Sequence, residues 1–138
     1  MTAFPAMIRT KVSKYFTLDE IECQCGCGYS NMSDDTLAIA DAVRDWQGSP
    51  VYCNSGCRCP NHNKAVGSKA MASRHLPIIH LGGGKFESDA MDLKVENPLK
   101  AAMYVKDNFP KASVIHYTWG IHIDCRDNPV VAIYPYFP

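Results

Sequence analysis

Hydrophobic positions divide this chain into a helical first part and a strand-rich second part. In the first part, apolar residues recur every three positions between residues 33 and 47, a spacing typical of one face of an amphipathic helix. Acidic residues fill the first turn of this segment, and Gly48 follows it as a stop signal, so we predict a helix over 33–47. The apolar face of that helix consists of Leu37, Ala40, Val43 and Trp46.

Three shorter helices are predicted from capping signals. Residues 17–20 (Thr-Leu-Asp-Glu) form a capping-box pattern, which indicates a helical turn that ends before the first cysteines. Pro60 and Gly67 bracket a small helix, because proline favours the first helical position and glycine the end. Asn97-Pro98 begins a further helix that ends near residues 109–110.

The strand signals lie mostly after residue 90. Apolar and β-branched runs predict strands, and Thr118-Trp119-Gly120 predicts a hairpin turn between two of them. Residues 69–84 show little periodicity and are expected to form a loop. Helices followed by a mostly antiparallel sheet indicate the α+β class, with the helices packed on a small sheet in one domain spanning residues 1–138. The expected strands are 51–53, 90–95, 113–117, 121–125 and 130–134.

Composition and charge exclude several classes of function. Hydrophobic residues make up 46% of the chain and charged residues 20%, as in ordinary globular proteins. The formal net charge is +0 and no basic tract is present, so we expect no nucleic-acid partner. No apolar run is long enough to insert into a membrane, and the first 14 residues lack the apolar core of a signal peptide. A monomer is expected.

Seven cysteines are unusual for a chain without a secretion signal. Three lie in the cysteine-rich segment 23–27, three lie between residues 53 and 59, and Cys125 stands alone. The two groups are expected to meet in space. The spacing Cys-x-Cys-Gly-Cys differs from that of a zinc knuckle, so three states stay open: a second, structural zinc, disulfides formed after release, or buried thiols.

Residues that could carry out catalysis or bind a metal concentrate in four motifs, three in the middle of the chain and one near its C-terminus. Residues 55–63 read Ser-Gly-Cys-Arg-Cys-Pro-Asn-His-Asn, residues 73–75 read Ser-Arg-His, and residues 89–92 read Asp-Ala-Met-Asp. Residues 121–124, Ile-His-Ile-Asp, add a second pair of a histidine and a carboxylate. Two histidines and an aspartate converging from separate elements would suit a zinc ion with one position left for water.

These motifs resemble the zinc peptidases of the bacterial cell wall, the D-alanyl-D-alanine carboxypeptidase and murein endopeptidase family, many of them phage-encoded. The resemblance covers roughly residues 16–126. It implies that His75, Asp92 and His122 are the zinc ligands. Relatives place the aspartate about seven residues after the first histidine, whereas here it follows after seventeen. Residues 76–87 therefore read as an inserted loop, and His80 within it is a rival ligand.

Substrate binding is assigned to Arg58 and Ser73. A guanidinium group can hold a carboxylate or a developing oxyanion in two directions at once, and relatives use the matching arginine in this way. Ser73, two residues before His75, is expected to hydrogen-bond to the substrate or to its own loop.

The general base is the open part of the assignment. Strand alternation directs His122, Asp124 and Arg126 into one row, with residues 121, 123 and 125 facing the core. Many relatives place the base three residues before the last histidine, a position that Trp119 occupies here. Asp124 is the preferred substitute as catalytic base, and His116 and Glu87 are alternatives.

The resemblance implies a zinc metallopeptidase that hydrolyses peptide bonds in the peptide stem or cross-links of peptidoglycan, as a viral lysin or a wall-modifying enzyme. The peptidoglycan peptide would be its substrate partner. Made in the cytoplasm without a signal peptide, it would act at the cell wall after release or within a virus particle. Two alternatives are a non-catalytic zinc-binding module of the same fold and a structural component of a virion.

Overall fold

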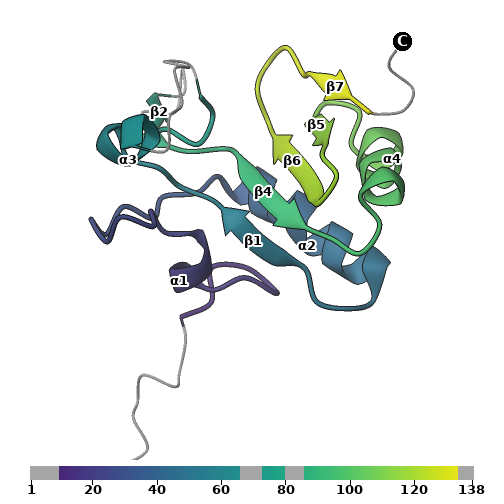
Figure 1. Cartoon of the computed structure of the whole chain (residues 1–138), viewed down its shortest axis with the longest axis horizontal. Coiled ribbons are helices and arrows are strands. Elements are labelled where there is room, and N and C mark those ends of the chain that lie inside the picture. The colour runs from purple at the N-terminus through teal and green to yellow at the C-terminus, as the bar shows by residue number, and fades with distance from the viewer. Residues whose placement is uncertain (1–9, 66–72, 80–85, 134–138) are drawn as a thin grey trace, which may run out of the picture.

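The chain folds around a five-stranded sheet. The computed structural model describes residues 10–65, 73–79 and 86–133. The strands lie in the order β1-β4-β6-β5-β7 (Figure 1). All neighbours are antiparallel except β5 and β7, which are parallel. The strands are β1 (Tyr52–Ser55), β4 (Met91–Lys94), β5 (Ser113–His116), β6 (Gly120–Asp124) and β7 (Val131–Ala132).

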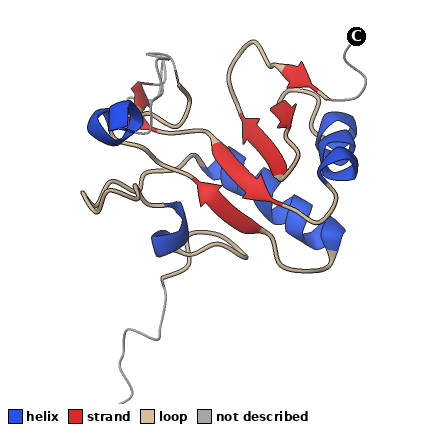
Figure 2. Cartoon of the chain, viewed as in Figure 1, coloured by secondary structure: helices blue, strands red, loops and turns tan. Residues whose placement is uncertain are grey.

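Four helices are present among the described residues. They are coloured blue in Figure 2. The predicted long helix is confirmed, and Gly48 ends it in a left-handed conformation. The capping box is also confirmed, since the Glu20 carboxylate accepts a hydrogen bond from the backbone N–H of Thr17 at 3.1 Å. The helices are α1 (Leu18–Ile21), α2 (Asp34–Gln47), α3 (Pro60–Ala65) and α4 (Pro98–Asn108). None of the described helices is long and apolar enough to cross a membrane.

The core lies between one face of the sheet and the helices α2 and α4. Alternate residues of the central strands point into it and are fully buried: Met91, Leu93, Val114, Ile121 and Ile123. From the helices it receives Leu37, Ala40, Val43, Ala102 and Val105. This arrangement confirms the α+β prediction, a single domain with helices packed on a mostly antiparallel open sheet.

Two predicted boundaries were wrong. The first strand does not end at residue 53 but continues to Ser55, after a β-bulge, and there pairs with Asp92. The segment expected to be loop contains β2 (Ile78–Ile79), which pairs with β3 (Phe86–Glu87) as an antiparallel ribbon. The inserted loop 76–87 thus leaves and rejoins the domain at neighbouring points, so its length does not separate His75 from Asp92.

Candidate metal centre

The sheet face opposite the core carries the polar residues of the site. The β4–β6 register pairs Asp92 directly with His122, and the β1–β4 register pairs Ser55 with Asp92. Directly paired residues project from the same face of a sheet, so these side chains gather over the middle of β1, β4 and β6. His75 joins them from the segment that follows α3.

Three potential ligands converge there. His75 Nε2 lies 3.3 Å from one carboxylate oxygen of Asp92, and His122 Nδ1 lies 2.9 Å from the other. One ligand atom from each of the three residues lies within 4.8 Å of the other two. The imidazole rings meet edge to face, with centroids 5.3 Å apart. Both histidines are buried.

Outer hydrogen bonds fix which ring nitrogen faces the centre. His75 Nδ1 lies 2.7 Å from the carbonyl oxygen of Gly56, which can only accept, so Nδ1 carries the hydrogen and Nε2 faces Asp92. His122 Nε2 lies 2.8 Å from the Asp124 carboxylate and donates to it, so Nδ1 faces Asp92. With neutral rings, two nitrogen lone pairs and a carboxylate would point at one another. Such a group requires a cation, either protons or a metal ion.

Electrostatics supports the same conclusion. Burial alone lowers the pKa of His122, but hydrogen bonds to Asp124 and Asp92 outweigh burial and raise the pKa to about 9. Burial raises the pKa of Asp92, yet its contacts with His122 and His75 bring the pKa well below the ordinary range. The pKa of Asp124 is likewise depressed, because His122 and Arg126 outweigh the effect of burial. In the metal-free state His122 is therefore protonated at neutral pH, and its positive charge lies where a metal ion could bind.

The main chain around His75 is held from several sides. Its carbonyl oxygen accepts hydrogen bonds from the Arg58 backbone N–H at 2.8 Å and from Ser88 Oγ at 2.6 Å. Its neighbour Arg74 donates from Nε to the fully buried carboxylate of Asp89 at 2.8 Å. The Ser-x-His motif is thereby fixed against the start of β4, which gives His75 one defined orientation.

Comparison with known protein families shows to which of them this chain belongs. The family described as Peptidase M15 matches residues 14–124, which is most of the chain. The chain belongs to the Peptidase M15 family. The resemblance found from the sequence motifs is therefore confirmed, and the family is one of metallopeptidases. No curated protein and no solved structure matches the chain.

Arg58 sits beside the three potential ligands of this M15 domain. Its Nε donates to Ser55 Oγ at 3.1 Å and its Nη1 to Asn63 Oδ1 at 3.2 Å. Nη2 lies 3.7 Å from the Asp92 carboxylate. The guanidinium is thus fixed in position beside the Asp92 carboxylate.

Asp124 lies on the outer side of His122, behind the ring as seen from Asp92. Both of its carboxylate oxygens accept from Arg126 Nε, at 2.9 and 3.0 Å, and the residue is fully buried. The row of His122, Asp124 and Arg126 expected from strand alternation is present. Within it, Asp124 orients the imidazole and holds the hydrogen on Nε2.

The structure brings some of the other expected site residues to the centre and leaves others away from it. Ser73 Oγ accepts the backbone N–H of His75 at 3.4 Å, so it contacts its own loop. His116 pairs with Ile121 and therefore projects from the core face, away from His122. Glu87 lies in β3 at the base of the ribbon. His80 lies outside the described residues.

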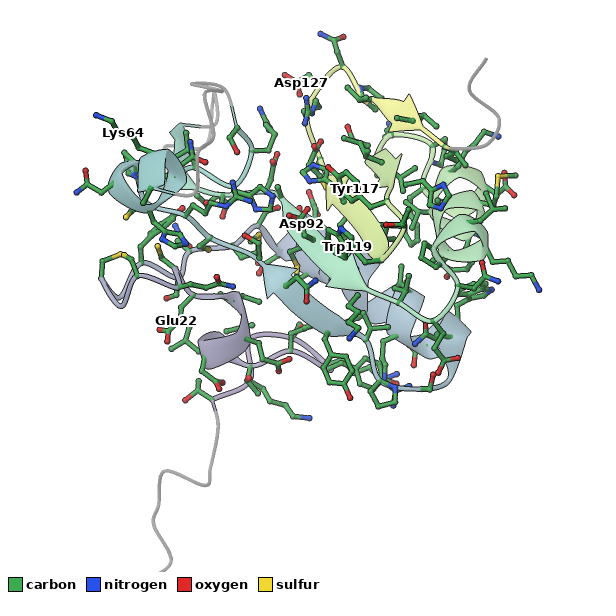
Figure 3. The ribbon with its side chains drawn as sticks, in the orientation of Figure 1. Glu22, Lys64, Asp92, Tyr117, Trp119 and Asp127 are labelled. Carbon is green, nitrogen blue, oxygen red and sulfur yellow. The ribbon has the colours of Figure 1, made fainter. Side chains whose placement is uncertain are left out.

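Sequence reasoning missed an aromatic pair at the end of the β5–β6 hairpin. The rings of Tyr117 and Trp119 are stacked with centroids 5.2 Å apart, and both are exposed by more than a third. Figure 3 shows both on the same part of the sheet as Asp92. Burial and the charge of Asp92 raise the pKa of Tyr117, while Arg58 lowers it, so the phenol lies within electrostatic reach of the site. The sequence signal that could have revealed this pair is the presence of two aromatic residues, two positions apart, just before the strand that carries His122.

Proposed function

We propose that this M15 protein is a zinc-dependent peptidase that hydrolyses peptide bonds in the peptide stem or cross-links of bacterial peptidoglycan. The observation that carries the proposal is the convergence of His75 Nε2, His122 Nδ1 and the Asp92 carboxylate, each oriented by an outer partner. The Asp92 side chain keeps 14% of its surface exposed, which leaves the centre accessible from the polar face.

The donor set fits zinc. Two imidazoles and a carboxylate are ligands that catalytic zinc commonly takes, with a fourth position left for water or substrate. When bound, zinc supplies a Lewis acid and an activated water at neutral pH. The three residues that would hold it are His75, Asp92 and His122.

The substrate proposal rests on Arg58 and the aromatic pair. A guanidinium fixed by Ser55 and Asn63 is suited to binding a substrate carboxylate or a developing oxyanion, as a stem peptide of the cell wall would offer. Tyr117 and Trp119 provide an exposed aromatic surface against which the peptide could pack. Arg58 would thus orient the peptide through its carboxylate, and packing against the aromatic pair would restrict the direction in which the peptide runs across the site.

We assign Asp124 to positioning rather than to proton transfer. Its carboxylate contacts His122 from the side away from Asp92 and is occupied by Arg126. Glu87 keeps the role of alternative base, and His116 projects from the other face.

A second candidate is a non-catalytic zinc-binding module. Trp119 occupies the position at which many relatives carry the base, which favours this alternative. In both cases we propose that the protein acts at the bacterial cell wall, after release or as part of a virus particle.

Hydrolysis of purified peptidoglycan separates the two functions. The zinc-loaded protein should release new amino groups from peptidoglycan, and a chelator should abolish that release. His122→Ala should lose the zinc of the histidine centre and the activity, because a two-ligand remnant rarely holds zinc. Binding of peptidoglycan without any release of amino groups by the zinc-loaded wild type would favour the non-catalytic module.

A further inference from the structure

A second group of potential metal ligands lies apart from the histidine centre. Cys23, Cys25 and Cys27 follow α1, and Cys59 immediately precedes α3. The four sulfur atoms all lie within 4.8 Å of one another. Cys25 Sγ is 3.4 Å from Cys23 Sγ and 3.6 Å from Cys59 Sγ. The remaining cysteines do not belong to this group.

These separations suit a metal better than disulfides. Zinc binds thiolates tetrahedrally at about 2.3 Å, which places the sulfurs roughly 3.8 Å apart. A disulfide would require about 2.05 Å between two sulfurs and would leave the other two cysteines unpaired or force a second bond. Four sulfurs gathered at the spacing of a tetrahedral edge are the arrangement of a closed structural zinc site.

The local backbone is built to present the sulfurs. Gly26 and Gly28 adopt left-handed conformations with φ of 83° and 89°, which turn the chain sharply between and after the cysteines. Two backbone N–H groups point at the sulfurs. Cys59 N lies 3.4 Å from Cys23 Sγ, and His62 N lies 3.4 Å from Cys59 Sγ. Such N–H donors stabilise the negative charge that thiolates carry when they bind a metal.

We propose that Cys23, Cys25, Cys27 and Cys59 hold a structural zinc ion, separate from the metal of the histidine centre. The four thiols would release their protons on binding, giving a zinc tetrathiolate of net charge −2. No substrate position remains in a site with four protein ligands, so its role is structural.

The position of Cys59 gives this zinc a specific task. Cys59 follows Arg58, whose backbone N–H donates to His75 and whose side chain approaches Asp92. On the other side of Arg58, the Cys57 N–H donates to the carbonyl of Ile21 at 2.9 Å. A zinc ion bridging the cysteine-rich segment and Cys59 would therefore fix the Arg58 loop from its far end.

The test is zinc stoichiometry, measured by native mass spectrometry on protein purified under reducing conditions. Wild type should carry two zinc ions per chain. The double variant Cys25→Ser, Cys27→Ser should carry one, and the double variant His75→Ala, His122→Ala should carry the other one. Cys125→Ser should keep two zinc ions and serves as the matched control, because the Cys125 sulfur lies outside the cluster and accepts a hydrogen bond from the Thr36 hydroxyl.

Cobalt substitution tests the same point independently of whether the cysteine variant folds. Wild type and the His75→Ala, His122→Ala variant should both show thiolate-to-cobalt charge-transfer absorption in the near ultraviolet. A wild-type chain with a single zinc and no such absorption would overturn the proposal. A mass lowered by two hydrogens in protein purified without reductant would then identify a disulfide. Loss of peptidase activity alone would bear on the proposed function and not on this zinc.

Discussion

At the scale of single residues, the two carboxylates that contact His122 have different tasks. Asp92 lies among the potential ligands, whereas Asp124 holds the opposite ring nitrogen. Asp124→Asn keeps an acceptor for Nε2–H but removes the charge. Because outer partners of this kind typically contribute 10- to 100-fold to metal affinity, we expect zinc affinity to fall by about that factor. Competition with a chromophoric chelator measures it.

The same variant distinguishes positioning from base catalysis. If Asp124 only orients His122, turnover at saturating zinc should return to near the wild-type rate. A general base would instead leave turnover about 10²- to 10⁴-fold low, however much zinc is added. That second result would restore the role expected from the sequence and contradict the positioning role assigned here.

Arg58→Lys tests the substrate contact. Lysine keeps the positive charge beside Asp92 but cannot hold Ser55, Asn63 and a substrate carboxylate with one planar group. Since hydrogen bonds to charged groups contribute about 1.5–3 kcal/mol, kcat/KM should fall roughly 10- to 100-fold with zinc content unchanged. Arg44→Lys on α2 makes the same exchange beside Tyr15, away from the sheet's polar face, and should leave kcat/KM at the wild-type value.

At the scale of elements, the site depends on how closely β4 and β6 approach. Gly120 pairs with Lys94, and a Cβ at Gly120 would lie 2.0 Å from the carbonyl oxygen of Leu93. Gly120→Ala must therefore push the strands apart and widen the separation of the Asp92–His122 pair. We expect a loss of about 3 kcal/mol or more in the free energy of unfolding, with weakened zinc binding.

Urea unfolding measures this effect. Lys94→Ala removes an exposed side chain from the same pair of residues and should change stability by less than about 0.5 kcal/mol. Equal stability of Gly120→Ala and wild type would show that the two strands tolerate a wider separation than the structure has.

The sequence was informative where chemistry is local and periodic. The helical spacing of α2 and the row of His122, Asp124 and Arg126 followed from short windows of residues. The register between β5 and β6 could not be predicted, because the residue that pairs with His116 across the hairpin depends on the exact turn. The carbonyl of Gly56, which orients His75, could not be found either, since a backbone atom leaves no sequence signal.

At the scale of the whole molecule, the two faces of the sheet contribute differently to stability. Its helix-covered face is apolar and stabilises the fold, while its other face concentrates ionisable groups at the cost of desolvating them. Some stability therefore depends on a cation at the centre. Cys59 of the cysteine cluster directly follows Arg58, whose Nη2 lies 3.7 Å from the Asp92 carboxylate, so the cluster and the centre adjoin the same loop.

This dependence predicts how the metal-free protein responds to pH. In the folded metal-free state the pKa of His122 is raised to about 9 from its ordinary value near 6.5. A raised pKa contributes stability that is complete below about pH 6.5 and is lost as pH rises through about 9. Asp92 has a depressed pKa, so its contribution is present above its ordinary pKa near 4 and is lost on acidification.

Chelator-treated protein should therefore be less stable at pH 9 than at pH 6, by up to about 3 kcal/mol from His122. The zinc-loaded protein should show a smaller loss, because the metal takes the place of the proton. Urea unfolding of metal-free wild type and metal-free His122→Asn at both pH values isolates this contribution, since the cysteine thiols are common to both proteins and cancel in the difference. Identical changes in the two proteins would mean that the His122 proton does not stabilise the folded chain.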